Sequence, residues 1–166
     1  MLFAFILRGM FHPIDPNHFR ASLGRFPSGV TVVSCKFEGQ VHGMTASAFV
    51  SVSMDPPLVL VSVARKARMH DKLIAADQFG ISILSEDQAH WSNHFAGKLH
   101  DSEPEFVEWD GVPVLEGALV NLVLKKDRAI EAGDHTLFLG EITHTRYSDQ
   151  EALLYFRGQY GGFRGK

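Results

Sequence analysis

The sequence of 166 residues predicts a mainly β domain, in which antiparallel strands form a closed barrel with short helices at its periphery. Six or seven segments are rich in β-branched and aromatic residues and are separated by short turn-forming stretches. Helical periodicity is confined to short stretches, and no internal repeat or heptad run is present. A sheet of this many strands has exposed edges unless it closes, so these observations favour a barrel.

A short amphipathic helix is expected first. Asp15 is a good N-cap, and Pro16 suits the first helical position. Helical spacing gives one apolar stripe, consisting of Phe19, Leu23 and Phe26. The segment 27–29 (PSG) should end the helix.

Strand patterns follow from residue 30. VTVVSCKF (30–37) and VHGMTASAFVSVS (41–53) flank a polar turn at 38–40, which predicts a hairpin. The DPP break at 55–57 precedes LVLVSV (58–63), whose nearly continuous apolar character predicts a central strand.

The second half alternates short helices and strands. A helix is expected around Met69–Ala76, then a strand at 79–84, then a helix from the Ser85/Gln88 capping box to about Phe95. Residues 97–117 are rich in turn formers and acids, which indicates a surface loop or lid. Three further strand candidates are 118–130, 135–147 and 152–160.

Composition limits the function classes. The net charge is -3 without a long run of like charges, so nucleic acid is an unfavoured partner. The apolar run after Met1 is too short to span a membrane and lacks the features of a signal peptide. We expect residues 1–9 to be an N-terminal extension before a natural start at Met10, with one domain at 10–166. The lone Cys35 permits no intramolecular disulfide, which suits a cytoplasmic protein.

Common catalytic and nucleotide motifs are missing. The sequence contains no G-x-G-x-x-G, no P-loop and no G-x-S-x-G elbow around Ser28. His90 and His94 have the spacing of a metal pair, but no motif glutamate or cysteine accompanies them, so a solvated helix face is favoured and no metal site is expected.

Two segments carry better candidate sites. Small and hydroxyl residues at 43–49 (GMTASAF) would let a flat ligand approach the backbone, although a tightly packed strand has the same composition. Residues 62–68 (SVARKAR) combine a hydroxyl, three cations and a helix start, which suits a phosphate, although a solvated basic loop is equally compatible.

Five segments together resemble a known family. FPSGVTVVS, GMTASAFVSVSMDPPLVLVSV, HFAGK, GDHTLFLGEI and LLYFRGQY occur in the order and spacing of the short-chain flavin reductases. The resemblance covers about residues 13–163. It implies an antiparallel FMN-binding split β-barrel that forms a homodimer. It also implies reduction of FMN, or FAD, by NADH or NADPH, and delivery of the reduced flavin to an oxygenase partner.

The resemblance also implies roles for individual residues. Thr45, Ala46 and Ser47 would bond the isoalloxazine edge, largely through backbone groups, and Ser51 would extend this contact toward the ribityl chain. The ribityl and phosphate end would be held by Ser62, Val63, Lys66 and Ala67. Further cofactor contacts are implied for Ser28, within FPSGVTVVS, and for Phe95, within HFAGK.

The resemblance gives His135 the catalytic position. It would place this histidine, after the Gly-Asp turn, at the face of the flavin, where it seats the nicotinamide; Tyr160 would lie on the same side. Hydride transfer between stacked rings needs orientation rather than an acid or base, which agrees with the missing triad. Without the resemblance, His135 is better explained as a strand-end histidine bonded to a neighbouring carbonyl or to Asp134, and Tyr160 as a core aromatic. Two alternative functions are a corrinoid reductase that uses bound FMN, and an FMN-binding protein without enzymatic activity.

Overall fold

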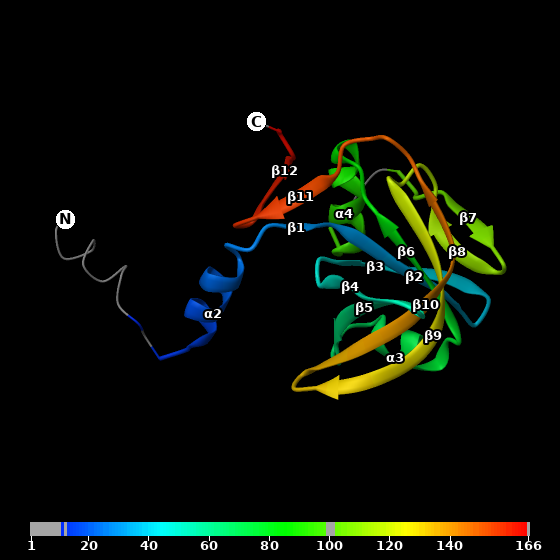
Figure 1. The fold of residues 1–166 in the computed structure, drawn as a ribbon, viewed down its shortest axis with the longest axis horizontal. Helices are drawn as coiled ribbons and strands as arrows, with labels where there is room; N and C mark the ends of the chain where they lie inside the picture. Colours follow the sequence, from blue (N-terminus) through cyan, green and yellow to red (C-terminus); the bar gives the residue numbers. More distant parts are fainter. Residues whose placement is uncertain (1–10, 12, 99–101, 166) are drawn as a thin grey trace.

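The computed structural model describes residues 11, 13–98 and 102–165, and its main feature is a curled antiparallel sheet (Figure 1). The sheet has seven strands in the order β3-β2-β6-β9-β10-β5-β4. Their bounds are Gln40–Ala46, Thr31–Phe37, Gln78–Ile83, Val120–Ala132, His135–Tyr147, Pro57–Ala64 and Phe49–Met54, respectively. The predicted mainly β class is therefore confirmed. The expected extension 1–9 and the start at Met10 lie outside the described residues.

The two edges of this sheet are consecutive in the chain. β3 pairs only with β2, and β4 pairs only with β5, among the ladders of the described residues. Among the described residues, no ladder joins β3 to β4, so the hydrogen-bonded sheet has two edges there. The strand predicted for residues 41–53 is divided at the same place. Ser47 and Ala48 belong to neither strand and connect the end of β3 to the start of β4.

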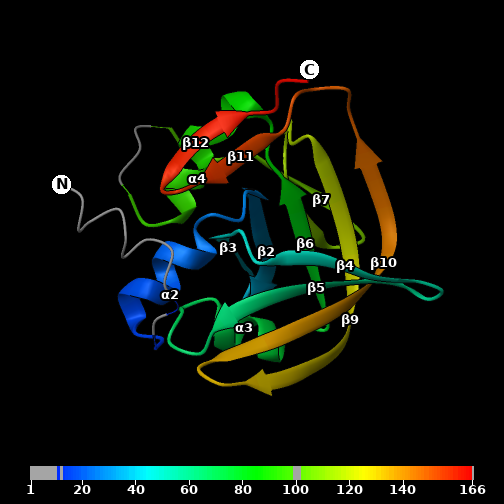
Figure 2. The same cartoon turned by 60° about the vertical axis from the view of Figure 1, so that its left-hand side comes forward.

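Smaller elements lie around the sheet. α2 (Pro16–Leu23), β1 (Ser28–Gly29), β11 (Leu153–Phe156) and β12 (Gln159–Gly162) lie together beside one end of the sheet (Figure 2). α3 (His70–Ala75) packs against β2, and α4 (Ala89–Phe95) follows a 3₁₀ turn at Glu86–Gln88. β1, β11 and β12 form their own three-stranded sheet.

Helix starts follow the sequence signals. The Asp15 carboxylate accepts from the N–H groups of Asn17 and His18, as an N-cap should. The amide of Ser85 donates to the side-chain oxygen of Gln88 over 3.1 Å, which confirms the capping box. α2 ends at Leu23 with Gly24 as its C-cap, so Phe26 lies beyond the helix.

The predicted lid at 97–117 is wrong. This segment contains the hairpin β7 (Phe106–Trp109) and β8 (Val112–Leu115), and every residue of β8 is buried. Ser34 on β2 donates to the carbonyl of Pro113 over 2.6 Å, which fastens β8 to the sheet. The hairpin is part of the packed body of the protein.

The main core lies inside the curled sheet. Its largest fully buried side chains are Phe79, Phe138 and Leu73, which pack together between the sheet and α3. β5 lies next to an edge rather than in the centre, and its burial alternates. Val59, Val61 and Val63 face the core, while the residues between them face outward.

Candidate functional site

The opening between β3 and β4 carries the centre of the candidate site. The Ser62 amide of β5 donates to the Ala48 carbonyl over 3.0 Å, so the β3–β4 crossover is held against β5. Just before the crossover, the Thr31 hydroxyl donates to the carbonyl of Ala46, the last residue of β3, over 2.7 Å. Ser47 and Ala48 are exposed, so these small residues are open to a ligand.

A large cavity begins at this crossover. Its volume is about 1280 Å³, and α2, β1, the crossover, β5 and the β11–β12 turn contribute to its lining. Ser28, Ser47 and Ser62 all line it, so three predicted contacts from distant segments come together. Pockets for one drug-sized ligand usually measure about 300–1,000 Å³. This cavity can therefore accept a flavin and leave space for a second ring system.

The alternation of β5 decides which residues reach the cavity. Leu60 and Ser62 line it. Val63 is only 1% exposed and belongs to the core on the other face. The side chain of Val63 is therefore no cofactor contact, and any contact from this residue must come from its backbone.

His135 stands beside this cavity. It is the first residue of β10 and pairs with Ala64, two residues after Ser62 on β5. Directly paired residues share a sheet face, so His135 and Ser62 share the outward face, roughly 7 Å apart along the strand. The side chain of His135 is 43% exposed, which leaves it accessible to a ligand.

Asp134 orients the ring of His135. Its carboxylate lies 2.7 Å from Nδ1, so Nδ1 is engaged and Nε2 points away from the carboxylate. The hydrogen bond and the charge of His135 lower the pKa of Asp134, with a smaller effect from Lys66. The hydrogen bond to Asp134 that a purely structural histidine would make is therefore observed. The same hydrogen bond also favours one orientation of the ring.

The basic segment after β5 lies against the same turn. The Arg65 amide donates to the Asp134 carbonyl over 3.0 Å, and its guanidinium bonds the Gly133 carbonyl. Lys66 is exposed, whereas Ala67 is partly buried against the core. Lys66 can therefore reach a phosphate near His135, but Ala67 offers little more than its backbone.

Thr45 and Ala46 face away from the cavity. The Thr45 hydroxyl donates to the Ser92 carbonyl of α4 over 2.6 Å. Ala46 is 7% exposed and its side chain lies in the core. Their predicted contacts with a flavin thus depend on backbone groups, as the resemblance implied.

Ser51 and Phe95 are separate from this cavity. Ser51 pairs with the core-facing Val59, and its side chain lies on the opposite face from Ser62. Phe95 packs over Gly43 and against Phe106. The structure therefore gives Phe95 a packing role, and the side chain of Ser51 lies away from the cavity lining.

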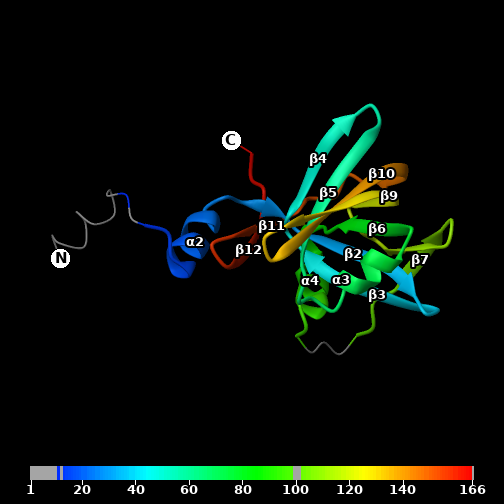
Figure 3. The same cartoon turned by 90° about the horizontal axis from the view of Figure 1, so that it is seen from below.

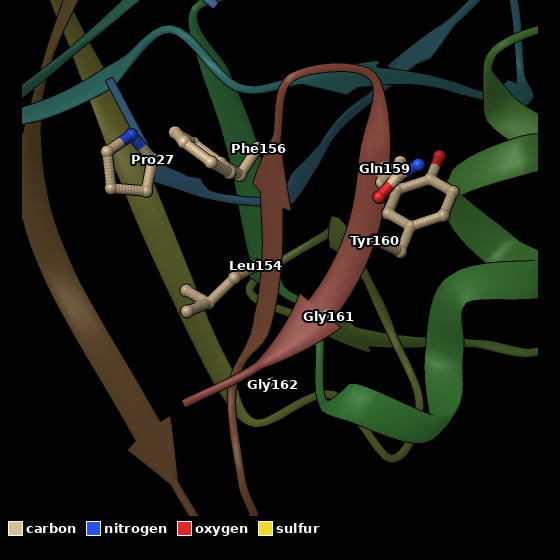
Figure 4. Close-up of a pocket in the computed structure, with 7 residues that line it drawn as sticks. All are labelled: Pro27, Leu154, Phe156, Gln159, Tyr160, Gly161 and Gly162. Carbon is tan, nitrogen blue, oxygen red and sulfur yellow. The ribbon is translucent and has the colours of Figure 1, made fainter. Parts of the chain in front are cut away.

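Tyr160 occupies a neighbouring hollow of about 360 Å³ on β11–β12. Its hydroxyl lies 2.8 Å from the Ser92 hydroxyl of α4, and its ring is tilted against Tyr155. Figure 4 shows the ring turned toward α4 and away from Leu154 and Phe156. Within one chain, Tyr160 is thus placed with α4, and its predicted position beside His135 is not reproduced.

Sequence reasoning missed three cations. Arg20, Arg25 and Arg157 line the large cavity, although they come from α2, the segment just after it and the β11–β12 turn. We had assigned phosphate binding to residues 62–68 alone. An arginine on a short helix has no motif to mark it, so only the fold could bring these residues to the cavity.

Other ligand classes find less support. The described residues include no group of three or more histidine, cysteine or acidic side chains suited to a metal ion. No helix in the described ranges is long and apolar enough to cross a membrane.

Known proteins resemble this chain in sequence and fold. The flavin reductase like domain matches residues 23–164. An NADH-dependent flavin reductase of Rhodococcus sp is 48% identical over 151 residues, which cover 89% of this chain and 86% of the relative. The flavin reductase PheA2 in its native state has 42% identity and a TM-score of 0.89, with 92% of this chain and 100% of that chain covered.

A further solved structure contains ligand fragments. It is the NADH:FAD oxidoreductase SgcE6 of Streptomyces globisporus C-1027 in complex with NAD and FAD fragments, with 36% identity and a TM-score of 0.85 over 93% of this chain and 98% of that chain. The family profile covers most of the sequence. The chain belongs to the flavin reductase like domain family.

Proposed function

We propose that this protein is an NADH-dependent flavin reductase that supplies reduced flavin to a partner oxygenase. The observation that carries the proposal is the convergence of Ser28, Ser47 and Ser62 on one cavity, with His135 on the adjoining outward face. The relatives described above are named for NADH and flavin, which favours this enzyme over a corrinoid reductase or a passive FMN-binding protein.

The residues fit a flavin and a nicotinamide side by side. A bound flavin would supply the hydride acceptor. The Ser47–Ala48 crossover and Ser62 would bond the polar edge of its ring, and Leu60 and Val50 would contact its apolar surface. FMN and FAD both agree with a cavity of this size, and Lys66 or the cavity arginines would bind their phosphates.

His135 would act by positioning the nicotinamide. Its ring is held by Asp134 and half-exposed, so it offers a flat polar surface with little freedom to turn. Reaction between two stacked rings depends strongly on their distance and alignment. This role needs no proton transfer, which agrees with a site that contains no catalytic triad.

The proposal includes a homodimer. Apolar side chains are exposed on the outward face beside the cavity: Val50 is 56% and Val52 47% exposed on β4, and Ile130 is 44% exposed on β9. α2 adds Phe19 at 55% and Leu23 at 57%. A second copy covering this surface would also close the open side of the cavity.

Cytoplasmic residence is part of the same proposal, supported by the free, buried Cys35.

The decisive experiment is anaerobic reduction. The purified protein is mixed with FMN, FAD or riboflavin, and NADH or NADPH is added while the visible flavin band is recorded. We expect rapid bleaching with NADH and slower bleaching with NADPH. Transfer to an oxygenase is tested by adding a two-component oxygenase that lacks its reductase and measuring product.

Two outcomes would contradict the proposal. If flavin binds but neither nucleotide bleaches it, the protein is a flavin carrier. If a cob(II)yrinate acceptor is reduced faster than free flavin, and without free reduced flavin, the corrinoid function replaces this one.

A further inference from the structure

Three arginines that line the large cavity are joined through the backbone of Gly24. The Gly24 amide donates to the Arg20 carbonyl over 2.9 Å, and the Arg157 amide donates to the Gly24 carbonyl over 3.0 Å. Arg25 follows Gly24 directly in the chain. The end of α2 and the β11–β12 turn are thus fastened together, which fixes where the three side chains begin. We call Arg20, Arg25 and Arg157 the arginine cluster.

The positive charge of the cluster has no carboxylate beside it. The Arg20 guanidinium donates to the Asn17 side-chain oxygen over 2.7 Å, and that of Arg25 bonds the Ala21 carbonyl, so both partners are neutral. None of the three arginines forms an ion pair within the described residues. The described residues that line the cavity include no aspartate or glutamate. A chain of net charge -3 thus surrounds this cavity with cations, which favours a phosphate-bearing ligand.

The conformation of Arg157 supports a role for its guanidinium. Arg157 and Gly158 are the two residues between β11 and β12, and their φ angles are 52° and 84°. Two-residue hairpin turns with positive φ favour Asn, Asp or Gly at the first position, because these residues adopt positive φ most readily. An arginine brings no benefit to the turn itself. Its presence is therefore better explained by the cation that it contributes to the cavity.

Aromatic side chains line the cavity on the same elements as the cluster. Phe19 lies on α2, Phe26 follows this helix, and Tyr155 lies on β11; all three are exposed. Nucleotide bases stack on exposed aromatic rings, and guanidiniums bind phosphate oxygens through paired N–H donors. Rings and cations together suit a nucleotide that carries a phosphate. The flavin ring itself is assigned to the crossover and β5, away from these elements.

We propose that the arginine cluster binds the adenylate half, adenosine with its phosphate, that FAD and NADH share. The guanidiniums bond the phosphate, and the adenine lies against the aromatic side chains of the same wall. The identity of the dinucleotides rests on the proposed reductase function. The assignment deepens that function by separating two phosphate sites: Lys66 serves the phosphate that FMN carries, and the cluster serves the phosphate of the adenylate.

The first test uses AMP as the probe and adenosine as its matched control without a phosphate. Isothermal titration calorimetry on the purified protein measures both affinities and needs no hydride transfer. We expect saturable AMP binding that weakens as salt is added, with adenosine at least about tenfold weaker. AMP binding without flavin bleaching would retract the reductase and keep this site. Flavin bleaching without a preference for AMP over adenosine would overturn this site and keep the reductase.

Arg157→Asn removes one cation and leaves a residue that suits the turn. Its melting temperature should equal or exceed that of the wild type, and its affinity for AMP should fall about tenfold. Arg146→Asn is the matched control, because Arg146 pairs with Glu116 and lies outside the lining of the large cavity. This control should bind AMP like the wild type. An equal loss of affinity in both variants would indicate a general charge effect and reject the cluster.

Two further measurements on Arg157→Asn identify the dinucleotide. Weaker FAD binding with unchanged FMN binding would assign the cluster to the adenylate of the flavin. A raised KM for NADH, measured with FMN as the flavin and with both flavin affinities unchanged, would assign it to the nicotinamide dinucleotide. Equal weakening of FMN and FAD would place the ribityl phosphate at the cluster and overturn the proposal.

Discussion

Phe95 lies so close to Gly43 that a Cβ on residue 43 would stand 2.6 Å from Cε1 of its ring. This approach lets α4 pack directly on β3, where Thr45 donates to the Ser92 carbonyl. The glycine in the GMTASAF segment is therefore required by helix packing rather than by a ligand.

Gly43→Ala should lower the free energy of unfolding by about 1–3 kcal/mol, because the aromatic ring must move to admit the methyl group. Urea denaturation measures the loss. Gly161→Ala is the matched control, since a Cβ there meets nothing within 4 Å. Combining Gly43→Ala with Phe95→Leu should restore part of the stability. Equal losses in the two glycine variants would show that Phe95 is not the cause.

His135→Ala should lower kcat/KM for NADH by about tenfold or more, because the nicotinamide loses its positioning surface. Flavin affinity should stay the same, and stopped-flow reduction at varied NADH measures both effects. Asp134→Asn keeps the size of the side chain that orients the ring, so it should lower kcat/KM by a smaller factor than His135→Ala does. If flavin binding is lost instead, His135 belongs to the flavin contact surface.

The charge of Asp134 should persist across the neutral range. Its pKa lies below the usual 3.8 because the His135 ring bonds the carboxylate and its charge favours the ionised form. The carboxylate is thus ionised above that value and takes up a proton only as pH falls through the lowered pKa. The KM for NADH should show no ionisation from Asp134 above about pH 4, and Asp134→Asn should leave the profile shape unchanged there.

Lys66→Ala should weaken FMN by about tenfold and riboflavin much less, because only FMN carries a phosphate for the ammonium group. Fluorescence titration with both flavins gives the comparison. Lys36→Ala is a control, because Lys36 pairs with Glu108 outside the cavity lining. Equal weakening of FMN and riboflavin would remove the phosphate role from Lys66 and direct attention to Arg20, Arg25 and Arg157.

Cys35 should resist alkylation in the native protein at pH 8 and react fully in urea. Burial raises the pKa of its thiol from 9.0 to about 11. Between these values the unfolded thiol ionises while the folded one keeps its proton, so stability falls as pH rises from 9 to about 11, by on the order of 2 kcal/mol. Cys35→Ala should lose less stability over this range, and an identical alkaline loss would contradict the shift.

Val50→Asp should convert a dimer into monomers, because it places a charge on the apolar outward face. Sedimentation velocity measures the change. Val41→Asp, on β3 at the other edge of the sheet, alters a valine that is also exposed, at 37%, and should leave the dimer intact. A monomeric wild-type protein would reject the dimer outright.

Much of the fold could be predicted from local signals, because caps and turns depend on residues close in sequence. Asp15 and Ser85 begin their elements as expected. The β7–β8 hairpin was missed although Asp110-Gly111 between apolar residues is a strong hairpin signal, and both residues have positive φ. The acidic character of the segment had favoured a loop.

The candidate site was predictable in its segments but only partly in its side chains. Ser28, Ser47 and Ser62 meet at the cavity as the resemblance implied. Val63 and Ser51 face elsewhere because neighbouring strand residues alternate between faces, and no motif reports which face a ligand uses. The strand break at Ser47–Ala48 has no glycine or proline to announce it, since it arises from the open sheet.

α2 extends away from the sheet and has no buried residue of its own (Figure 3). Eight residues are too few for a helix to persist in water without tertiary support. In the proposed homodimer a second copy would supply that support, so ordering of this segment should depend on protein concentration. Dilution would unfold α2, which forms one wall of the large cavity, before the sheet loses any structure. Activity would therefore disappear at concentrations where the rest of the domain is still folded.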